Sequence, residues 1–292
     1  MYFRAYNPRA IQRLASMYKM KISMDMKNKN LVLVAFIALF FVQCSFLPKF
    51  QCGSYVENGN CGLDMKMIYV EGGSYDQGSD YDYNKRTISL DGFWIGECEV
   101  TQAQWAAVMG TSIYEQCYRA KQQSGELRPI RGAGHNYPMY CVTYDEAQEF
   151  CRRLSGMTGR KYELPTEAQW EFAARGGNKT RGCRYSGGDY IYDVAWCKAN
   201  SGGGCRPVKS LRPNELEIYD MSGNVTEWCK DWYNDHYSYE RNNPQGPHYG
   251  QRRVVRGGSW RWDDGQCCVY AREKYLPTLA ITYLGFRVVC LK

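Results

Sequence analysis

The sequence has few histidines and no long apolar segment. Its three histidines, His135, His236 and His248, are far apart along the chain, which argues against a zinc or iron centre built from imidazole ligands. The most apolar segment, residues 31–42, is shorter than the roughly 20 residues that a membrane-spanning helix requires. This second absence favours an export signal over a membrane span.

The net positive charge of the chain is concentrated in the N-terminal segment. The formal charge is +7, but residues 1–43 alone hold seven basic residues and one acidic residue. The remaining residues hold 30 basic and 29 acidic side chains, so this part of the chain is almost neutral. A nucleic-acid-binding protein needs a basic surface that neutralises phosphates. We therefore expect no nucleic-acid partner.

Common catalytic motifs are also missing. Arg261 stands where a Gly-x-Ser-x-Gly nucleophile elbow, starting at Gly257, would need its last glycine. The sequence contains no phosphate-binding loop, no dinucleotide-binding fingerprint and no Cys-x-x-Cys zinc motif. These absences exclude the most easily recognised classes of enzyme.

Cysteine, in contrast, is abundant. Fourteen cysteines in this chain indicate an oxidising compartment, where disulfides form and persist. Lys27 and Lys29 precede the short apolar segment, an arrangement typical of an export signal. Cys44 follows in a relaxed lipoprotein box, so we predict that it is acylated after cleavage. Ordinary secretion and a retained anchor are the alternatives.

These features divide the chain into three parts. We predict a leader at residues 1–43, a tether at 44–65 and one folded domain at 66–292. The protein is then exported and held in the cell envelope, on its periplasmic or outer face, by a lipid anchor in the membrane.

The predicted domain combines clear helices with long irregular segments. Thr101, Thr143 and Thr166 are each followed three residues later by Gln or Glu, the pattern of a helix-starting capping box. Beyond residue 177 the periodicity fades, and Gly, Asn, Pro, Tyr and Trp dominate between short strands such as 253–256. We therefore predict an α+β domain with a low content of regular secondary structure.

Five separated motifs carry a family resemblance. They are GFWIG at 92–96, LPTEAQWE at 164–171, YDMSGNV at 219–225, RGGSW at 256–260 and LGFRV at 284–288. Together they resemble the formylglycine-generating-enzyme (sulfatase-modifying factor, FGE-sulfatase) domain family over about residues 66–290. The resemblance implies a fold related to C-type lectins, but fold does not determine function.

The resemblance argues against catalysis. Catalytic members of the family hold Cu(I) between two cysteines and use O₂ to convert a sulfatase cysteine to formylglycine. The second of these cysteines corresponds to Cys267, but the first corresponds to Trp262, whose indole cannot bind copper. We therefore expect a non-catalytic protein, with Cys267 in a disulfide or an inert thiol. A copper-dependent oxidase that keeps Cys267 as its catalytic thiol is the alternative.

The resemblance also implies a calcium site. One calcium site of the family corresponds to the side chains of Asp220 and Glu227 and the carbonyls of Gly223 and Val225. Calcium prefers oxygen ligands, and a turn with two carboxylates supplies several of them. A tight turn with capping or solvated carboxylates is the alternative interpretation.

A C-terminal segment is the predicted ligand-binding face. It is rich in aromatic and charged residues, which suit a recognition surface for an unknown ligand or protein. Some bacterial members of this class are variable products of diversity-generating retroelements, with the variable segment between RGGSW and LGFRV, and the placement of this segment fits that arrangement. The predicted face comprises Trp260, Arg261, Trp262, Asp264, Tyr270, Arg272, Tyr275 and Tyr283.

Overall fold

The computed structural model describes residues 54–57, 63–79, 85–237 and 239–291. The predicted leader and the lipidation residue Cys44 lie outside these ranges. The strands are β1 (Ser54–Glu57), β2 (Met65–Val70), β3 (Gly73–Gln77), β4 (Arg86–Leu90), β5 (Phe93–Gly96), β6 (Tyr162–Glu163), β7 (Thr226–Trp232), β8 (Arg253–Arg256), β9 (Arg272–Tyr275), β10 (Leu284–Gly285) and β11 (Val289–Cys290).

In the described residues, five α-helices accompany these strands. They are α3 (Gln102–Met109), α4 (Ile113–Ser124), α5 (Tyr144–Thr158), α6 (Glu167–Ala174) and the single turn α7 (Ile191–Val194). None of these described helices combines the length and apolar composition of a membrane span. The long irregular stretch between α6 and β7 confirms the predicted α+β class with little regular structure.

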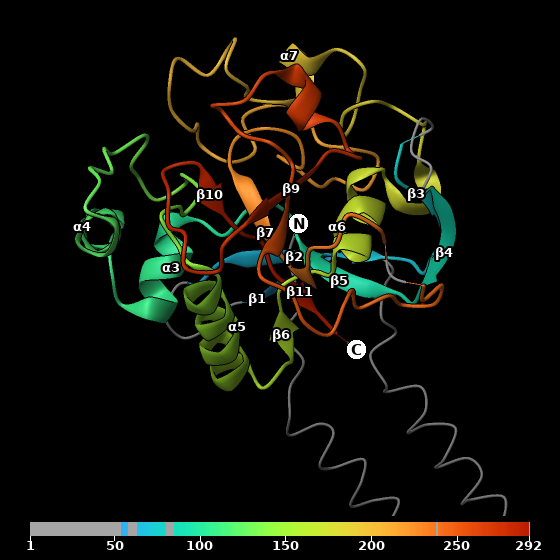
Figure 1. Ribbon diagram of the computed structural model, residues 1–292, viewed down its shortest axis with the longest axis horizontal. Helices are drawn as coiled ribbons and strands as arrows, with labels where there is room; N and C mark the ends of the chain where they lie inside the picture. Colours follow the sequence, from blue (N-terminus) through green and yellow to red (C-terminus); the bar gives the residue numbers. More distant parts are fainter. Residues whose placement is uncertain (1–53, 58–62, 80–84, 238, 292) are drawn as a thin grey trace, which may run out of the picture. The chain divides into compact units, whose positions relative to one another are not determined.

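Three sheets are present among the described residues, and the two larger ones organise the domain. The largest has the strand order β1-β2-β5-β11-β6, the second has the order β10-β7-β8-β9, and the third pairs β3 with β4. The C-terminal strand β11 is central because it pairs antiparallel with β5 on one side and with β6 on the other. Figure 1 shows α3 and α5 packed beside these strands, and long irregular segments around α7 at the top of the view. Closing the chain onto itself in this way brings its distant motifs together.

The larger sheet begins earlier in the chain than we predicted. Strand β1 pairs with β2 in register from Ser54 opposite Ile68 to Glu57 opposite Met65. Leu63 is also buried in the main apolar core. Residues 54–57 and 63–65, which we assigned to a tether, are therefore part of the folded domain. Alternation of apolar residues is weak over so short a strand, so the sequence alone did not reveal it.

The predicted capping boxes are present. Thr101, Thr143 and Thr166 each accept the N3 backbone N–H, and the N3 side chain accepts the N-cap N–H in return. Ser112 and Glu115 form a fourth capping box, which starts α4 and which we did not predict. This local chemistry satisfies N–H groups that a helix end otherwise leaves without partners.

One buried ion pair connects the two sheets. Arg287 donates to Glu227 through Nε and Nη2, both at 2.7 Å from a carboxylate oxygen, and both side chains are buried. The Trp170 indole N–H adds a hydrogen bond to the same carboxylate at 2.8 Å. Arg287 also donates to the carbonyls of Gly96 and Tyr219. The guanidinium therefore joins β5, β7 and the 219–225 turn.

We expect Arg287→Met to destabilise the protein strongly. The substitution leaves the Glu227 carboxylate buried without its cation, and breaking such a pair costs about 3–5 kcal/mol of unfolding free energy. Urea denaturation measures this loss. The control is Arg152→Met, since Arg152 is 72% exposed in its pair with Glu149 and should contribute no more than about 1 kcal/mol. Equal losses in the two variants would contradict this role of the ion pair.

Candidate functional site

Four of the predicted face residues meet around one tyrosine ring. The Trp262 ring lies edge-on to Tyr283 with centroids 5.9 Å apart, and the Arg261 guanidinium lies 5.3 Å from the centre of the same ring. The Tyr275 side chain adjoins both Trp262 and Tyr283. Arg261 is exposed and the three rings are half-buried. We call these four residues the aromatic face.

Trp260 forms the floor of the aromatic face. Its ring contacts Tyr283 at 6.2 Å between centroids, but only 7% of the residue is exposed. Its indole N–H donates to the Thr282 carbonyl, and the Arg131 guanidinium lies over the ring. Trp260 therefore supports the face from below and offers little surface to a ligand.

The other three predicted face residues lie in different surroundings. Asp264 is close to Arg184 and Tyr185, and Tyr270 packs against two apolar clusters. Arg272 is bound through two nitrogens to the buried Glu167 carboxylate, at 2.6 and 2.8 Å. This ion pair gives Arg272 a structural role in holding β9 to α6.

The Cys267 thiol is inaccessible. It is fully buried, and its sulfur lies so close to Gly258 that a Cβ added there would come within 2.8 Å of it. Cys267 belongs to a small apolar cluster that also contains Cys197 and Cys268. The Cys268 sulfur accepts a hydrogen bond from Arg184. Burial, and then the neighbouring Cys197, raise the pKa of Cys267. A soft metal or a substrate thiol needs an accessible thiolate, which these surroundings disfavour.

The predicted calcium turn has one carboxylate at its start and one inside the ion pair. Asp220 adopts φ +57° and accepts the Lys209 backbone N–H at 2.7 Å. The Glu227 oxygen Oε1 accepts one hydrogen bond, from Arg287, and a carboxylate oxygen has capacity for a further partner. Among the described residues, no group of three or more His, Cys, Asp and Glu side chains is arranged around one metal position. A cation there would depend on the carbonyls of the turn.

Glu99 is a buried acid that our reading of the sequence missed. Its carboxylate oxygens are buried and have no hydrogen-bond partner among the described residues. Burial, and then the charges of Asp220 and Glu227, raise its pKa well above the usual value. Burial also raises the pKa of Asp220 to about 6. The available signal was an acid placed between strand β5 and helix α3, directly before Val100.

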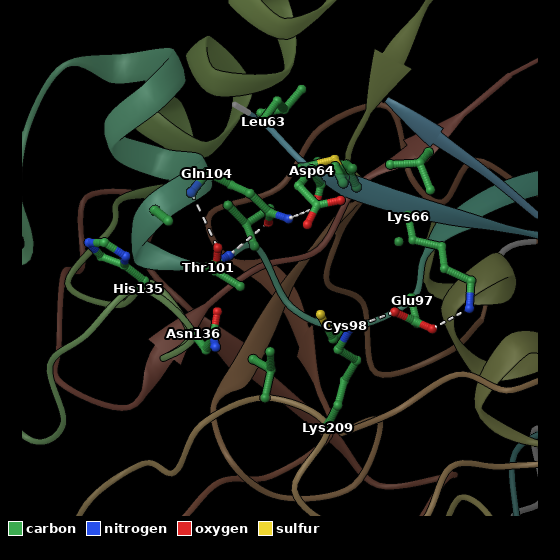
Figure 2. Close-up of a pocket in the computed structure, with 17 residues that line it drawn as sticks. Leu63, Asp64, Lys66, Glu97, Cys98, Thr101, Gln104, His135, Asn136 and Lys209 are labelled. Carbon is green, nitrogen blue, oxygen red and sulfur yellow. Dashed lines mark hydrogen bonds and ion pairs between the residues drawn. The ribbon is translucent and has the colours of Figure 1, made fainter. Parts of the chain in front are cut away.

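A cavity of about 510 Å³ lies on the other side of this segment (Figure 2). The Glu97 carboxylate lines the cavity and forms ion pairs with two lysine ammonium groups, at 2.6 Å from Lys66 and 2.9 Å from Lys209. Thr101 and Gln104, the capping pair of α3, line the cavity as well. None of the residues that we predicted as functional lines it.

The fold and the comparisons with known proteins agree. The family model described as "Sulfatase-modifying factor enzyme 1-like domain" matches residues 57–291. The solved structure of Treponema denticola variable protein 1 superposes with a TM-score of 0.69 and 27% identity, over 81% of this chain and 98% of that one. The architecture is therefore the C-type-lectin-like fold of the formylglycine-generating type.

Two curated relatives extend the match along the sequence. Chaperone protein LppX of Paenibacillus barcinonensis is 29% identical over 70% of this chain and 81% of its own length. The formylglycine-generating enzyme of Mus musculus is 27% identical over 76% of this chain and 74% of its own length. The chain belongs to the sulfatase-modifying factor domain family.

We expect Cys267 to resist alkylation in the folded protein. Iodoacetamide at mildly alkaline pH should leave it unmodified because its sulfur is buried and its pKa is raised. The half-buried Cys183 serves as the internal comparison and should be labelled first. In urea both should react. Peptide mass mapping measures the labelling. Rapid reaction of Cys267 in the native protein would contradict this prediction and support the alternative, a copper-dependent oxidase.

Proposed function

We propose that this chain is an exported, non-catalytic member of its family that binds a partner through the aromatic face. One observation carries the proposal: Cys267 is fully buried against Gly258. The family resemblance, which aligns Trp262 with the other copper-binding cysteine, supports it. A thiol with a raised pKa and no exposed surface is a poor nucleophile and a poor metal ligand.

The chemistry of the aromatic face supports binding. Trp, Tyr and Arg side chains contribute most strongly to protein interfaces, because they bury a large area and still donate hydrogen bonds. Trp262 and Tyr283 hold each other through an edge-on ring contact, and Tyr275 adjoins both, so little side-chain entropy is lost when a partner docks. The likeness to a solved variable protein is consistent with a diversified version of this face.

Export with a lipid anchor completes the proposal. A short apolar segment after Lys27 and Lys29 and before Cys44 matches an export signal followed by an acylated cysteine. An anchor of this kind would place the aromatic face in the cell envelope, where the partner is a ligand or protein of that compartment.

Site-specific cross-linking tests the aromatic face. A photo-reactive benzophenone residue in place of Arg261, introduced into the full chain in its native cells, should capture one defined partner. Trp262→Ala should lower the affinity for that partner at least tenfold, about 1.4 kcal/mol, since it removes a central aromatic anchor. The same probe in place of Arg152 on α5 is the control. Equal capture from both positions, or none from position 261, would count against the proposal.

We also propose a calcium ion at the 220–227 turn. The carboxylates of Glu99, Asp220 and Glu227 are buried and influence one another, and the Arg287 guanidinium is the buried cation that acts on all three. Buried carboxylates without partners are unfavourable, and the Glu99 oxygens, which have no hydrogen-bond partner among the described residues, support the proposal. A divalent cation bound by Asp220 and turn carbonyls would offset it.

Calcium should therefore stabilise the protein. At a free concentration 100 times the dissociation constant, a bound ion raises the free energy of unfolding by about 2.7 kcal/mol. Urea denaturation with and without calcium measures this, with magnesium as the comparison ion. Asp220→Asn should abolish the response, and Asp263→Asn, at an exposed position outside the turn, should retain it. A wild-type protein that shows no response to calcium would exclude the ion.

A further inference from the structure

We propose that Cys117 and Cys141 form a disulfide bond that attaches helix α4 to the core. The two sulfurs lie 3.4 Å apart, in van der Waals contact, and both residues are buried. A disulfide requires about 2.05 Å between sulfurs, a distance that small side-chain rotations reach from this starting point. The inference goes beyond the proposed function, because it concerns a covalent link that neither the partner nor the calcium ion requires.

Helix α4 gains most from such a link. Figure 1 shows it at the margin of the domain, beyond α3. It buries only one side, where Ile113, Cys117 and Ala120 face the core, and its Tyr114 and Tyr118 side chains are exposed. A covalent bond at the centre of the buried side would hold the whole helix.

The second cysteine lies at a rigid point of the core. Cys141 is fully buried, and its backbone N–H donates to the Ile281 carbonyl. Its φ of +57° is unusual for a residue other than glycine, so the surrounding structure holds it in one conformation. A link to Cys141 therefore attaches α4 to a fixed point.

The reaction needs an external disulfide as oxidant. The Cys117 thiolate attacks one sulfur of that disulfide, which breaks its S–S bond, forms a mixed disulfide and releases one thiol. Cys141 then loses its proton and attacks the Cys117 sulfur, which releases the second thiol. The two cysteines lose two electrons and two protons, and the external disulfide is reduced to two thiols. Because both sulfurs are buried, the exchange takes place before α4 has docked.

A third cysteine near this pair defines the competing outcome. Cys205 is buried close enough to influence the titration of Tyr140 together with Cys117 and Cys141. Its sulfur donates to the Arg131 carbonyl at 3.1 Å, which directs it away from the pair. Pairing of Cys205 with either of the two is the outcome that the geometry disfavours.

Peptide mapping of the refolded chain tests the link. The full chain is unfolded, reduced and refolded in a buffer of reduced and oxidised glutathione; free thiols are then blocked with iodoacetamide and the protein is digested without reductant. We expect one cross-linked peptide pair that contains Cys117 and Cys141 and disappears on reduction. Carbamidomethyl groups on both cysteines, or a cross-link from either to Cys205, would overturn the proposal. The oxidant is supplied in vitro, so the result does not depend on export.

Stability in the two redox states provides the second measurement. The two cysteines are 24 positions apart in the sequence. A disulfide that closes a loop of this length should lower the equilibrium constant for unfolding about 100-fold. Cys117→Ala should abolish the difference between oxidised and reduced protein. The matched control is Cys151→Ala, which removes a buried cysteine from the neighbouring helix α5 and should retain the difference. A wild-type protein that is equally stable in both states would contradict the link.

Discussion

The buried pair of Arg287 and Glu227 is the constraint on which the rest of the structure depends. A carboxylate and a guanidinium taken out of water are costly unless each has its full set of partners. Here the Trp170 indole and the carbonyls of Gly96 and Tyr219 complete the set. The groups therefore come from four separate segments, which are β5, α6, residues 219–227 and the segment that holds Arg287. All four segments must reach their places before the pair is satisfied, so folding them together is cooperative.

The same ion pair determines where acidic side chains gather in the core. Glu227 brings a second and a third acid, Asp220 and Glu99, close to one guanidinium, and this accumulation of negative charge favours a bound cation. The aromatic face, in contrast, belongs to the connection between β8 and β10 and contributes no member of the ion pair. Its side chains are therefore free to suit a partner without disturbing the interaction that holds the sheets.

The candidate site was predictable in part. The family resemblance aligned Trp262 with a copper-binding cysteine of the catalytic members, because this alignment needs only the spacing from the RGGSW motif. The sequence did not predict which of the candidate face residues lie together. Arg272 and Trp262 are close in the chain, but Arg272 pairs with Glu167 on α6 and lies outside the aromatic face. Glu99 was missed because its burial and the nearby charges of Asp220 and Glu227 arise only in the folded domain, from residues far away in the sequence.

Local chemistry determined the helix starts: in three capping boxes a threonine and a Gln or Glu three residues later satisfy each other's neighbouring N–H groups, and no distant residue is needed. Composition and motif order likewise determined the α+β class and the family. Only the tertiary structure decided that β1 belongs to the sheet, that Cys267 is enclosed and that Cys117 meets Cys141. These features are contacts between residues distant in the chain, and their free energy exists only once the whole domain has closed around them.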